Sequence, residues 1–348
     1  MLARGPTRSS VVLRNGMQVD LRVVSAANYG AALMYFTGSK PHNIALRGIA
    51  AARGLKLNEY GLFDGTHRIA ARTEEEIYRV FGLPYIEPEL RLDHGEIEAA
   101  RRGKLPHLVT LADIRGDLHA HTTASDGRAS LAEMVKAARE RGYSYLAISD
   151  HSKRVTVAHG LDAKRLARQI EEIARLNETL SDIAVLKSVE VDILEDGRLD
   201  LPNDILARLD FAVGAVHSAF DLPRDKQTAR LLKAMDNRHL AVLAHPTGRL
   251  IEERPGYDID MEHVLAGARE RGCAVEVNGQ PDRLDLNEWH CKLAKEIGVK
   301  LVLSTDAHSV AELGFMRYAV DQARRGWLEP GDIINTSDLP ALKESLRR

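Results

Sequence analysis

The chain has 348 residues, of which 44% are hydrophobic, and a formal net charge of −2. Its length fits one large domain or two. The near-neutral balance excludes a global field that would attract nucleic acid, so DNA binding would need a local basic patch. Two cysteines without a Cys-x-x-Cys pair argue against a disulfide scaffold and fit a reducing compartment. No apolar run approaches about 18 residues and no signal peptide is evident, which predicts a cytoplasmic protein without membrane contact.

A β-hairpin is predicted at the start of the chain. Two β-rich runs, 10–13 and 18–24, flank Asn15-Gly16, a dipeptide typical of tight hairpin turns. Asp20 lies in the second run, where its carboxylate could face solvent or hold a metal ion. A Gly-Ser turn at 38–39 then precedes a predicted helix. This pattern fits either a phosphate cradle or an ordinary serine cap.

Three stretches of this segment are 18–22 (QVDLR), 35–39 (YFTGS) and 57–62 (LNEYGL). Together with Asn43 and Arg47, they resemble the end of the palm and the thumb of family X DNA polymerases. The resemblance implies that Asp20 is the third catalytic carboxylate of a polymerase site. It further implies that Tyr35, Phe36 and Gly38 line a pocket for the nucleotide sugar. Asn43 and Arg47 would lie near the incoming base and the template.

The carboxylates around Asp20 depart from the family pattern. The family's paired carboxylates lie upstream of this strand, whereas the 19 residues before Asp20 contain no Asp or Glu. Two-metal nucleotidyl transfer needs several carboxylates. We therefore expect that this chain does not polymerise DNA and that it is a truncated family X polymerase. The palm remnant should be an incomplete sheet with exposed edges.

Residues 86–113 read as a linker between the N-terminal segment, 1–85, and a C-terminal domain, 114–348. The linker contains Pro88 and a short charged helix at 93–102, whose charges we expect to face solvent.

The C-terminal domain alternates predicted strands and helices. The strands are 114–118, 145–149, 184–191, 211–216, 241–244, 274–277 and 300–304. The helices are 131–141, 163–179, 225–237, 261–271 and 287–297. The right-handed crossover rule predicts a parallel sheet from this alternation. Seven units over about 230 residues fit a barrel of the TIM type that is one unit short.

Residues with metal-ligand chemistry recur at or just beyond the ends of these strands. They are His119, His121, Asp126, His151, Glu190, His217, His245, Asp306 and His308. Each alone has a simpler explanation, such as a hydrogen-bonded histidine or, for Glu190, an ion-pair partner. However, the carboxyl ends of parallel strands meet at one rim. His119 and His121, two apart on an extended chain, also point the same way. The set therefore predicts a metal cluster.

Six imidazoles and three carboxylates exceed what one ion can bind. We expect two or three divalent ions with a bridging carboxylate such as Glu190. The ligand types suit Mn²⁺ or Zn²⁺, with Fe²⁺ as an alternative. Ions about 3.5–4 Å apart would acidify a shared water and hold phosphate oxygens. The implied reaction is hydrolysis of a phosphoester by metal-bound hydroxide.

The ligands fall into four motifs, which are His119-x-His121 with Asp126, Asp150-His151, His245-Pro246 and Asp306-x-His308. These motifs resemble the PHP (polymerase and histidinol phosphatase) family across about residues 114–348. The resemblance implies an α/β fold, a distorted (β/α)7 TIM-like barrel, and it implies all nine ligand positions.

Five further stretches resemble the C-terminal domain of bacterial family X polymerases more specifically. They are 196–202 (DGRLDLP), 216–220 (VHSAF), 245–249 (HPTGR), 282–286 (DRLDL) and 323–327 (ARRGW). There the domain is implied to be a Mn²⁺-dependent 3′–5′ exonuclease and 3′-phosphatase in DNA repair. Its partner would be a DNA 3′ end in a gapped or recessed duplex.

Cations near the predicted site are candidates for phosphate binding. Arg249 and Arg283 offer planar forks for a phosphate, and Lys153 follows His151. The alternative is contact with solvent or a carboxylate such as Asp282. We expect Asp150 to orient a ligand histidine through a hydrogen bond.

Two other functions use the same residues. One is a small-molecule phosphatase of the histidinol-phosphatase type, and the other is a non-catalytic DNA-binding scaffold. The thumb-like stretch favours DNA ends over a small molecule, and the complete ligand set argues against a scaffold. No pattern in the sequence indicates an oligomeric state.

Overall fold

The predicted hairpin turns at Asn15-Gly16 in the computed structural model, which describes residues 1–348. Gly16 has φ of 87°, a left-handed conformation that glycine adopts without steric cost. The hairpin strands are β2 (Arg8–Val12) and β3 (Gln18–Arg22), paired antiparallel, and β1 (Ala3–Arg4) adds a third short strand. All residues of β3 are exposed, so this small sheet has an open edge, as the sequence predicts.

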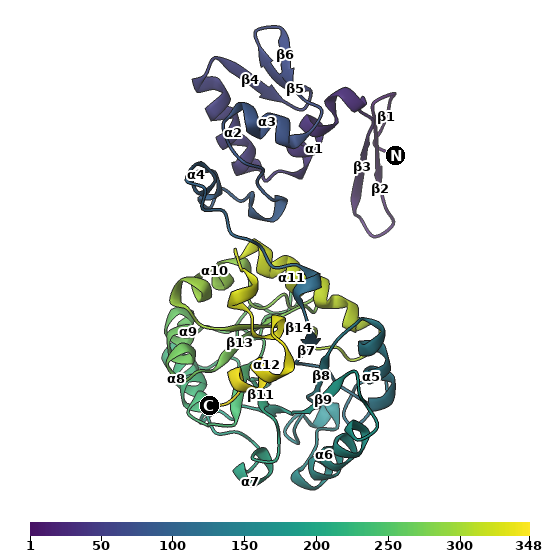
Figure 1. The fold of residues 1–348 in the computed structure, drawn as a ribbon, viewed down its shortest axis with the longest axis vertical. Coiled ribbons are helices and arrows are strands. Elements are labelled where there is room, and N and C mark those ends of the chain that lie inside the picture. Colours follow the sequence, from purple (N-terminus) through teal and green to yellow (C-terminus); the bar gives the residue numbers. More distant parts are fainter. The chain divides into compact units, whose positions relative to one another are not determined.

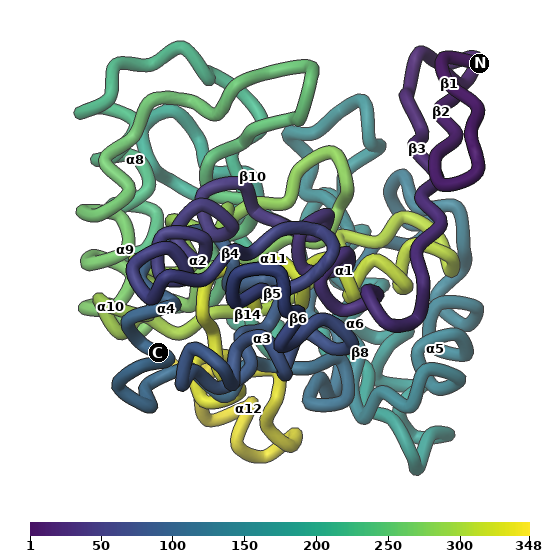
Figure 2. The backbone as a smooth tube through the Cα atoms, turned by 90° about the horizontal axis from the view of Figure 1, so that it is seen from above, coloured from purple at the N-terminus to yellow at the C-terminus, as the bar shows by residue number.

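The hairpin belongs to the first of two units, Met1–Leu105 and Pro106–Arg348. Its other elements form a second antiparallel sheet, β4-β5-β6, and four helices. They are α1 (Tyr29–Thr37), α2 (Lys40–Ala52), β4 (Leu55–Asn58), β5 (Gly61–Asp64), β6 (His67–Ala70), α3 (Glu74–Val80) and α4 (Glu96–Arg101). Figure 2 shows the β1–β3 sheet as a separate lobe at the N-terminal end of the tube.

Helix α2 begins where the Gly-Ser turn predicts a helix start. Ser39 is its N-cap, and the hydroxyl accepts a hydrogen bond from the backbone N–H of His42 at 3.3 Å. Pro41 lies in the first turn, where its missing N–H costs nothing. The serine therefore serves as an ordinary cap in this structure.

The short helix of the predicted linker packs within the first unit. Its Glu96 is fully buried and pairs with His42, with Oε1 2.6 Å from Nδ1. The backbone N–H groups of Asp93 and His94 also donate to the Glu96 carboxylate. The expectation that the helix charges face solvent is thus wrong for Glu96, although Glu98 is exposed. A buried carboxylate needs such partners, and they come from distant residues.

The second unit contains eight parallel strands with helices around them (Figure 1). Its strands are β7 (Gly116–Asp117), β8 (Tyr145–Ile148), β9 (Ala184–Lys187), β10 (Glu190–Asp192), β11 (Ala212–Ala215), β12 (Leu240–Leu243), β13 (Ala274–Asn278) and β14 (Leu301–Ser304). Its helices are α5 (Leu131–Glu140), α6 (Ala163–Asn177), α7 (Asn203–Leu206), α8 (Arg224–Met235), α9 (Met261–Glu270), α10 (Glu288–Ile297), α11 (Met316–Arg325) and α12 (Leu339–Ser345).

The α/β class with a parallel sheet is confirmed, but the strands form two sheets rather than one closed ladder. One sheet has the order β7-β8-β9 and the other β10-β11-β12-β13-β14. The predicted strand 184–191 is split into β9 and β10. Isolated parallel bridges link the two sheets on both sides, His151 with Glu190 and Ala120 with Ala307.

Asn335 occupies the remaining gap between β14 and β7. Its Nδ2 donates to the carbonyls of Gly116 and Leu303, both at 2.8 Å, and its Oδ1 accepts from the Leu303 N–H at 3.0 Å. One amide side chain thus takes the place of a missing stretch of β-ladder. This contact joins residues more than 200 positions apart, which strand periodicity cannot predict.

Most strand residues are fully buried, as expected for a parallel sheet covered on both faces. A large apolar core lies between strands and helices, and a smaller one joins strand residues to Ile334, Leu342 and Leu346. None of the helices combines the length and apolar character needed to cross a bilayer.

Candidate metal centre

The His-x-His pair is fixed by backbone contacts on two sides. Ala120, between His119 and His121, pairs with Ala307 and donates its N–H to the Ser149 hydroxyl at 3.0 Å. The His121 N–H donates to the Ala307 carbonyl at 2.8 Å. The two rings lie 5.1 Å apart between centroids, so both reach the same space.

Glu190, the first residue of β10, lies at the centre of the cluster. One carboxylate oxygen, Oε1, lies 2.8 Å from His245 Nε2 and 3.3 Å from His217 Nε2. The other, Oε2, lies 2.6 Å from His151 Nδ1. It also lies 3.6 Å and 3.8 Å from the Nε2 atoms of His119 and His121. Five of the six predicted ligand imidazoles therefore face one carboxylate.

Asp306, two residues beyond the end of β14, approaches His119 and His121 and also the sixth imidazole, His308. Its Oδ1 lies 3.0 Å from His121 Nε2, 3.5 Å from His119 Nε2 and 3.8 Å from His308 Nδ1. Asp306 and His245 have φ of 52° and 26°, in the left-handed region that non-glycine residues seldom adopt. Such conformations cost about 1–3 kcal/mol each and cluster at functional sites.

Asp126 completes the set from the loop after β7. Its carboxylate lies 3.4 Å from His308 Nε2 and 3.6 Å from His151 Nε2. All nine predicted residues thus belong to one continuous cluster. Three groups of them have ligand atoms within 4.8 Å of one another: His121, Asp126, His151 and His308; His119, His121 and Asp306; and His151, Glu190 and His217.

Buried polar atoms in this cluster lack hydrogen-bond partners. They include His119 Nε2 and His121 Nδ1, and also His151 Nδ1 and Glu190 Oε2, which lie 2.6 Å apart without the geometry of a hydrogen bond. Buried polar atoms are nearly always paired, so such orphans need an explanation. Imidazole nitrogens and carboxylate oxygens converging on shared spaces are the donor set that divalent transition metals take. The residues present therefore fit a cluster of divalent ions.

The electrostatics of the cluster keep its carboxylates ionised. Burial alone would raise the pKa of Glu190, but the imidazoles of His151, His217 and His119 hold it well below its usual range. The pKa of Asp306 is likewise held low by His119 and His121 against the effect of burial. Burial and the neighbouring His308 and His151 lower the pKa of His121 to about 4. Metals bind ionised carboxylates and neutral imidazoles, so ions entering the cluster would displace protons from His217 and His308, whose pKa the neighbouring carboxylates raise to about 9 against the effect of burial.

Two carboxylates outside the predicted set orient two of the predicted ligand histidines. Glu276 in β13 accepts a hydrogen bond from His119 Nδ1 at 2.8 Å, and Asp192 in β10 lies 3.2 Å from His217 Nδ1. Both are fully buried. The signal for Glu276 was available in the sequence, because a charged residue inside the apolar run 274–278 (AVEVN) needs a partner.

Asp150 has a different role from the one predicted for it. Its carboxylate accepts hydrogen bonds from Thr122, Ser125 and Gln169 rather than from a histidine. These contacts hold the 122–125 turn, which leads directly into Asp126. Asp150 therefore positions a predicted metal ligand through the backbone of its loop.

The three phosphate-binding candidates differ in whether their cationic groups are already hydrogen-bonded or ion-paired within the chain. Arg249 donates through Nε to the Arg283 carbonyl at 2.6 Å and through Nη2 to the Leu284 carbonyl. Arg283 Nε lies 3.6 Å from Asp306 Oδ2, beside the cluster. Lys153 is exposed and lines a groove after β8. Arg249 is thus committed to holding a loop, while Arg283 and Lys153 can still reach a ligand.

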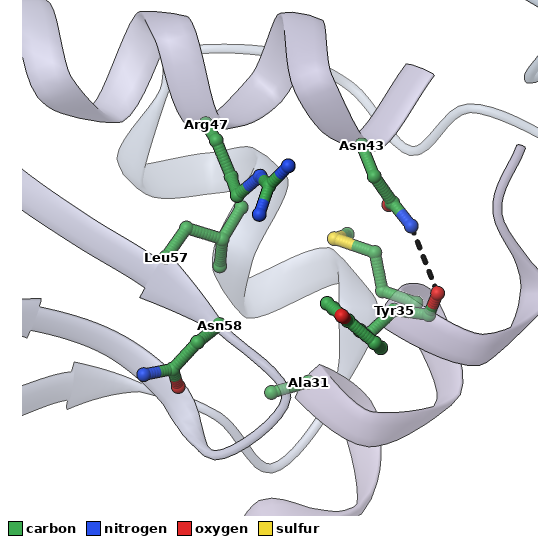
Figure 3. A pocket seen from close by; sticks show the side chains of 7 residues that line it. Ala31, Tyr35, Asn43, Arg47, Leu57 and Asn58 are labelled. Atoms are coloured by element: carbon green, nitrogen blue, oxygen red, sulfur yellow. Dashed lines mark hydrogen bonds between the residues drawn. The ribbon is translucent and has the colours of Figure 1, made fainter. Parts of the chain in front are cut away.

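The polymerase-like residues of the first unit line a small pocket between α1, α2 and β4 (Figure 3). Tyr35, Asn43 and Arg47 face it together with Leu57 and Asn58. Asn43 Nδ2 donates to the Tyr35 carbonyl at 2.8 Å. Local hydrogen bonding therefore fixes the relation between α1 and α2.

Phe36 and Gly38 lie at the C-terminal end of α1. Phe36 is exposed and packs edge-on against Tyr35 with centroids 5.1 Å apart. Gly38 ends α1 with φ of 75°, which favours glycine at this position.

Asp20 is exposed on β3 and bonds within the hairpin. Its carboxylate accepts from the Ser10 hydroxyl, from Gln18 Nε2 at 2.9 Å and from Arg8 Nη2 at 3.3 Å. The Ser10 and Gln18 hydrogen bonds lower the pKa of Asp20. It is the only acidic residue among the first 58, so no neighbouring carboxylate completes a two-metal site in this segment.

Two family models match the chain. A DNA polymerase beta thumb matches residues 32–92, and a PHP domain matches residues 117–278. These ranges fall in the first and second units respectively.

Similar proteins carry one or both regions. The DNA polymerase/3′-5′ exonuclease PolX of Bacillus subtilis (strain 168) is 42% identical over 352 residues, covering 100% of this chain and 61% of the relative. This chain thus spans about three fifths of the length of that relative. A "Probable phosphatase" of Thermoanaerobacter sp. (strain X514) is 29% identical over 242 residues, covering 66% of this chain and 94% of the relative.

Among solved structures, a histidinol phosphate phosphatase of Lactococcus lactis, complexed with zinc, L-histidinol and phosphate, aligns with a TM-score of 0.42. Its sequence is 15% identical, and the alignment covers 60% of this chain and 93% of that one.

Proposed function

Because this chain joins a DNA polymerase beta-type thumb to a PHP domain, as bacterial family X DNA polymerases do, we propose that it is a divalent-metal phosphoesterase acting on DNA 3′ ends. The reaction would be 3′–5′ exonucleolytic cleavage or removal of a 3′-phosphate. In this assignment residues 114–348 form the phosphoesterase domain, 1–85 a thumb with a palm remnant, and 86–113 the linker.

The observation that carries the proposal is the position of Glu190. Its carboxylate oxygens lie within 3.8 Å of ring nitrogens from five histidines. An imidazole ring seldom needs a carboxylate shared with four others, whereas a carboxylate that bridges ions collects their other ligands around it. We propose that the nine clustered residues hold two or three ions, Mn²⁺ or Zn²⁺.

The chain's own residues would bind and orient the ester. Bound divalent ions supply Lewis-acid activation of water and of phosphate oxygens. Arg283, 3.6 Å from Asp306, is placed to contact a phosphate oxygen at the edge of the cluster. Glu276 and Asp192 hold His119 and His217 in fixed orientations, so the ligand set is ordered before substrate arrives.

The charge distribution supports DNA as the partner. The first 58 residues contain eight Lys or Arg and only one acidic residue, although the whole chain has a net charge of −2. Such a local excess of positive charge favours the phosphate backbone of nucleic acid. We expect this sequence by itself not to polymerise DNA, because Asp20 has no second carboxylate near it in the chain.

The decisive experiment measures activity and metal content together. Purified protein loaded with Mn²⁺ or Zn²⁺ is given a 3′-recessed duplex, a duplex with a 3′-phosphate and histidinol phosphate. We expect release of nucleotide or phosphate from the DNA ends, loss of this activity in His119→Ala, and retention in Glu262→Gln, an exposed carboxylate on α9. Hydrolysis of histidinol phosphate alone would favour the small-molecule alternative, which the alignment over 94% of the Thermoanaerobacter "Probable phosphatase" makes worth testing.

A further inference from the structure

A basic groove lies beside the metal cluster, at the C-terminal ends of β8 and β10. It is lined by Lys153, Arg154 and Thr156 on one side and by Arg198, Asp200 and Pro202 on the other. Three cations face a single carboxylate in this lining. The lining also contains Leu194, Leu199, Leu201 and Pro202, so the groove offers three cations to a negatively charged chain and apolar side chains to its sugars and bases.

The groove is built directly onto the strand ends that carry the cluster. The Ser152 N–H donates to the Glu190 carbonyl at 2.9 Å, and the Asp192 N–H donates to the Ser152 hydroxyl at 2.9 Å. Lys153 follows two residues after His151, a span of at most about 7 Å along the backbone. A strand held in the groove therefore needs to extend only a short distance to reach the cluster.

The opposite wall is fixed by the same elements. The Asp200 N–H donates to the Asp192 carbonyl at 3.1 Å, and Asp200 Oδ2 accepts from the Arg154 N–H at 2.9 Å. Both walls are thus tied through backbone to β10, whose first residue is Glu190. This arrangement keeps the groove and the cluster in a constant relation.

The cations of the groove are available for a ligand. The side chains of Lys153 and Arg154 make no hydrogen bond or ion pair within the chain and are exposed. Arg198 pairs through Nε with Asp196 Oδ2 at 2.6 Å, which leaves its terminal nitrogens unused.

We propose that this groove binds the sugar-phosphate backbone of the single strand that leads to the reacting ester. The inference rests on the proposed function and deepens it. Lys153 and Arg154 would contact successive phosphates, and the Arg198 guanidinium would contact the opposite side of the strand. The enzyme would then recognise a nucleotide chain as well as its terminal ester.

The proposal predicts that affinity rises with strand length. In the wild-type full chain, KM should fall from a dinucleotide to a hexanucleotide with the same 3′ end. In Lys153→Ala/Arg154→Ala, the fall in KM with strand length should largely vanish. KM for the hexanucleotide should rise by about 10-fold or more, because two charge-assisted contacts are lost. The salt dependence of binding should weaken by about 0.7 in slope per lost phosphate contact.

Two controls make the outcome specific. Lys343→Ala removes an exposed cation on α12, which pairs with Asp210 at 3.8 Å near the start of β11 and outside the groove. The hydrolysis of bis(p-nitrophenyl) phosphate, a diester without a strand, should change at most about 2-fold in Arg154→Ala, which removes a groove cation but leaves Lys153 in place. Arg198→Ala, from the other wall, should shift KM in the same direction by a smaller factor.

The results separate the groove from the proposed function. Equal KM values for the double variant and Lys343→Ala would overturn the groove while leaving the function standing. Equal losses of Arg154→Ala on the hexanucleotide and on the small diester would also overturn it, because they would indicate damage to the cluster. If the wild type cleaved no strand, the groove could still be tested by measuring the binding of a labelled hexanucleotide by fluorescence anisotropy, with a chelator present. The double variant should then bind more weakly than the wild type, and unchanged binding would overturn the groove.

Discussion

In the first unit the polymerase-like residues of α1 and α2 lie within 35–47, whereas the nine ligand-type residues of the second unit extend from His119 to His308. The first set is held by local contacts such as Asn43 to the Tyr35 carbonyl. The second depends on strands that meet only in the folded domain. A short segment can thus keep its shape through local contacts, while a convergent cluster of ligand-type residues depends on every strand that supplies it.

The largest expected effect tests that dependence. Glu190→Gln should lower kcat/KM by at least about 100-fold, since even residues outside the ligand set of a metal cost about 10–100-fold when changed. Metal content should fall as well, measured by elemental analysis of the same sample. Hydrogen exchange in α1–α3 should not change. Full activity in this variant would contradict the cluster as the reactive centre.

Glu276→Gln should have the next largest effect. The amide can no longer offer a charged acceptor to His119 Nδ1, which now receives the hydrogen bond at 2.8 Å. We expect metal affinity to fall about 10–100-fold while the fold is kept. Titration with Mn²⁺ checks this, with Glu262→Gln as the matched exposed control. An unchanged affinity would mean that backbone contacts alone orient His119.

In the first unit, Glu96→Gln should reduce stability rather than activity. Burial would raise the pKa of Glu96, but hydrogen bonds from His42 and from backbone N–H groups lower it below its ordinary value of 4.5. A lowered folded-state pKa stabilises the protein above the ordinary value, and this contribution disappears as the pH falls through the folded pKa. The variant should lose about 1–3 kcal/mol locally at neutral pH.

This pH dependence separates the buried carboxylate from its exposed neighbour. The difference between wild type and Glu96→Gln, followed by hydrogen exchange in α2–α4, should shrink as the pH is lowered below 4.5. Glu98→Gln on the same helix, where the carboxylate forms exposed pairs with Arg101 and Arg102, should show little difference at any pH. A constant difference for Glu96→Gln across this range would contradict the contact between His42 and the ionised carboxylate of Glu96.

The smallest effect is expected for Asp20→Asn. Its carboxylate bonds to Ser10, Gln18 and Arg8 on an exposed sheet. Exposed contacts contribute little, so exchange of the β2–β3 amides should rise by less than about 5-fold. A much larger rise would mean that the hairpin depends on this one side chain, and the contrast between local and convergent sites would weaken.

The sequence predicts much of this structure where a local pattern is enough. Asn15-Gly16 predicts the hairpin, Ser39 the helix start, and the spacing of His119 and His121 their common direction. Alternating strands and helices also predict that the ligand-type residues meet at one rim. The assignment of those residues as metal ligands remains a prediction that metal analysis must test.

Other features depend on long-range contacts. The burial of Glu96 requires His42, which lies 54 residues earlier. The predicted strand 184–191 is divided by its pairing, because β9 pairs with β8 whereas β10 pairs with β11. The role of Glu276 was missed because its strand reads as apolar, although the buried charge was visible. Asp150 was assigned to a histidine, whereas the fold brings the 122–125 turn to it.

Asn335 gives the C-terminal residues an influence on chemistry that they do not touch. Its amide bonds Gly116 and Leu303, each three positions ahead of a ligand-type residue, His119 and Asp306. The matched PHP range stops at residue 278, so a fragment cut to that range would lose Asp306, His308 and this tie. Proteolysis just before residue 335 should likewise loosen the seam between the first and last strands. The C-terminal residues therefore hold β7 and β14 together through Asn335, and any shortened version of this domain should retain them.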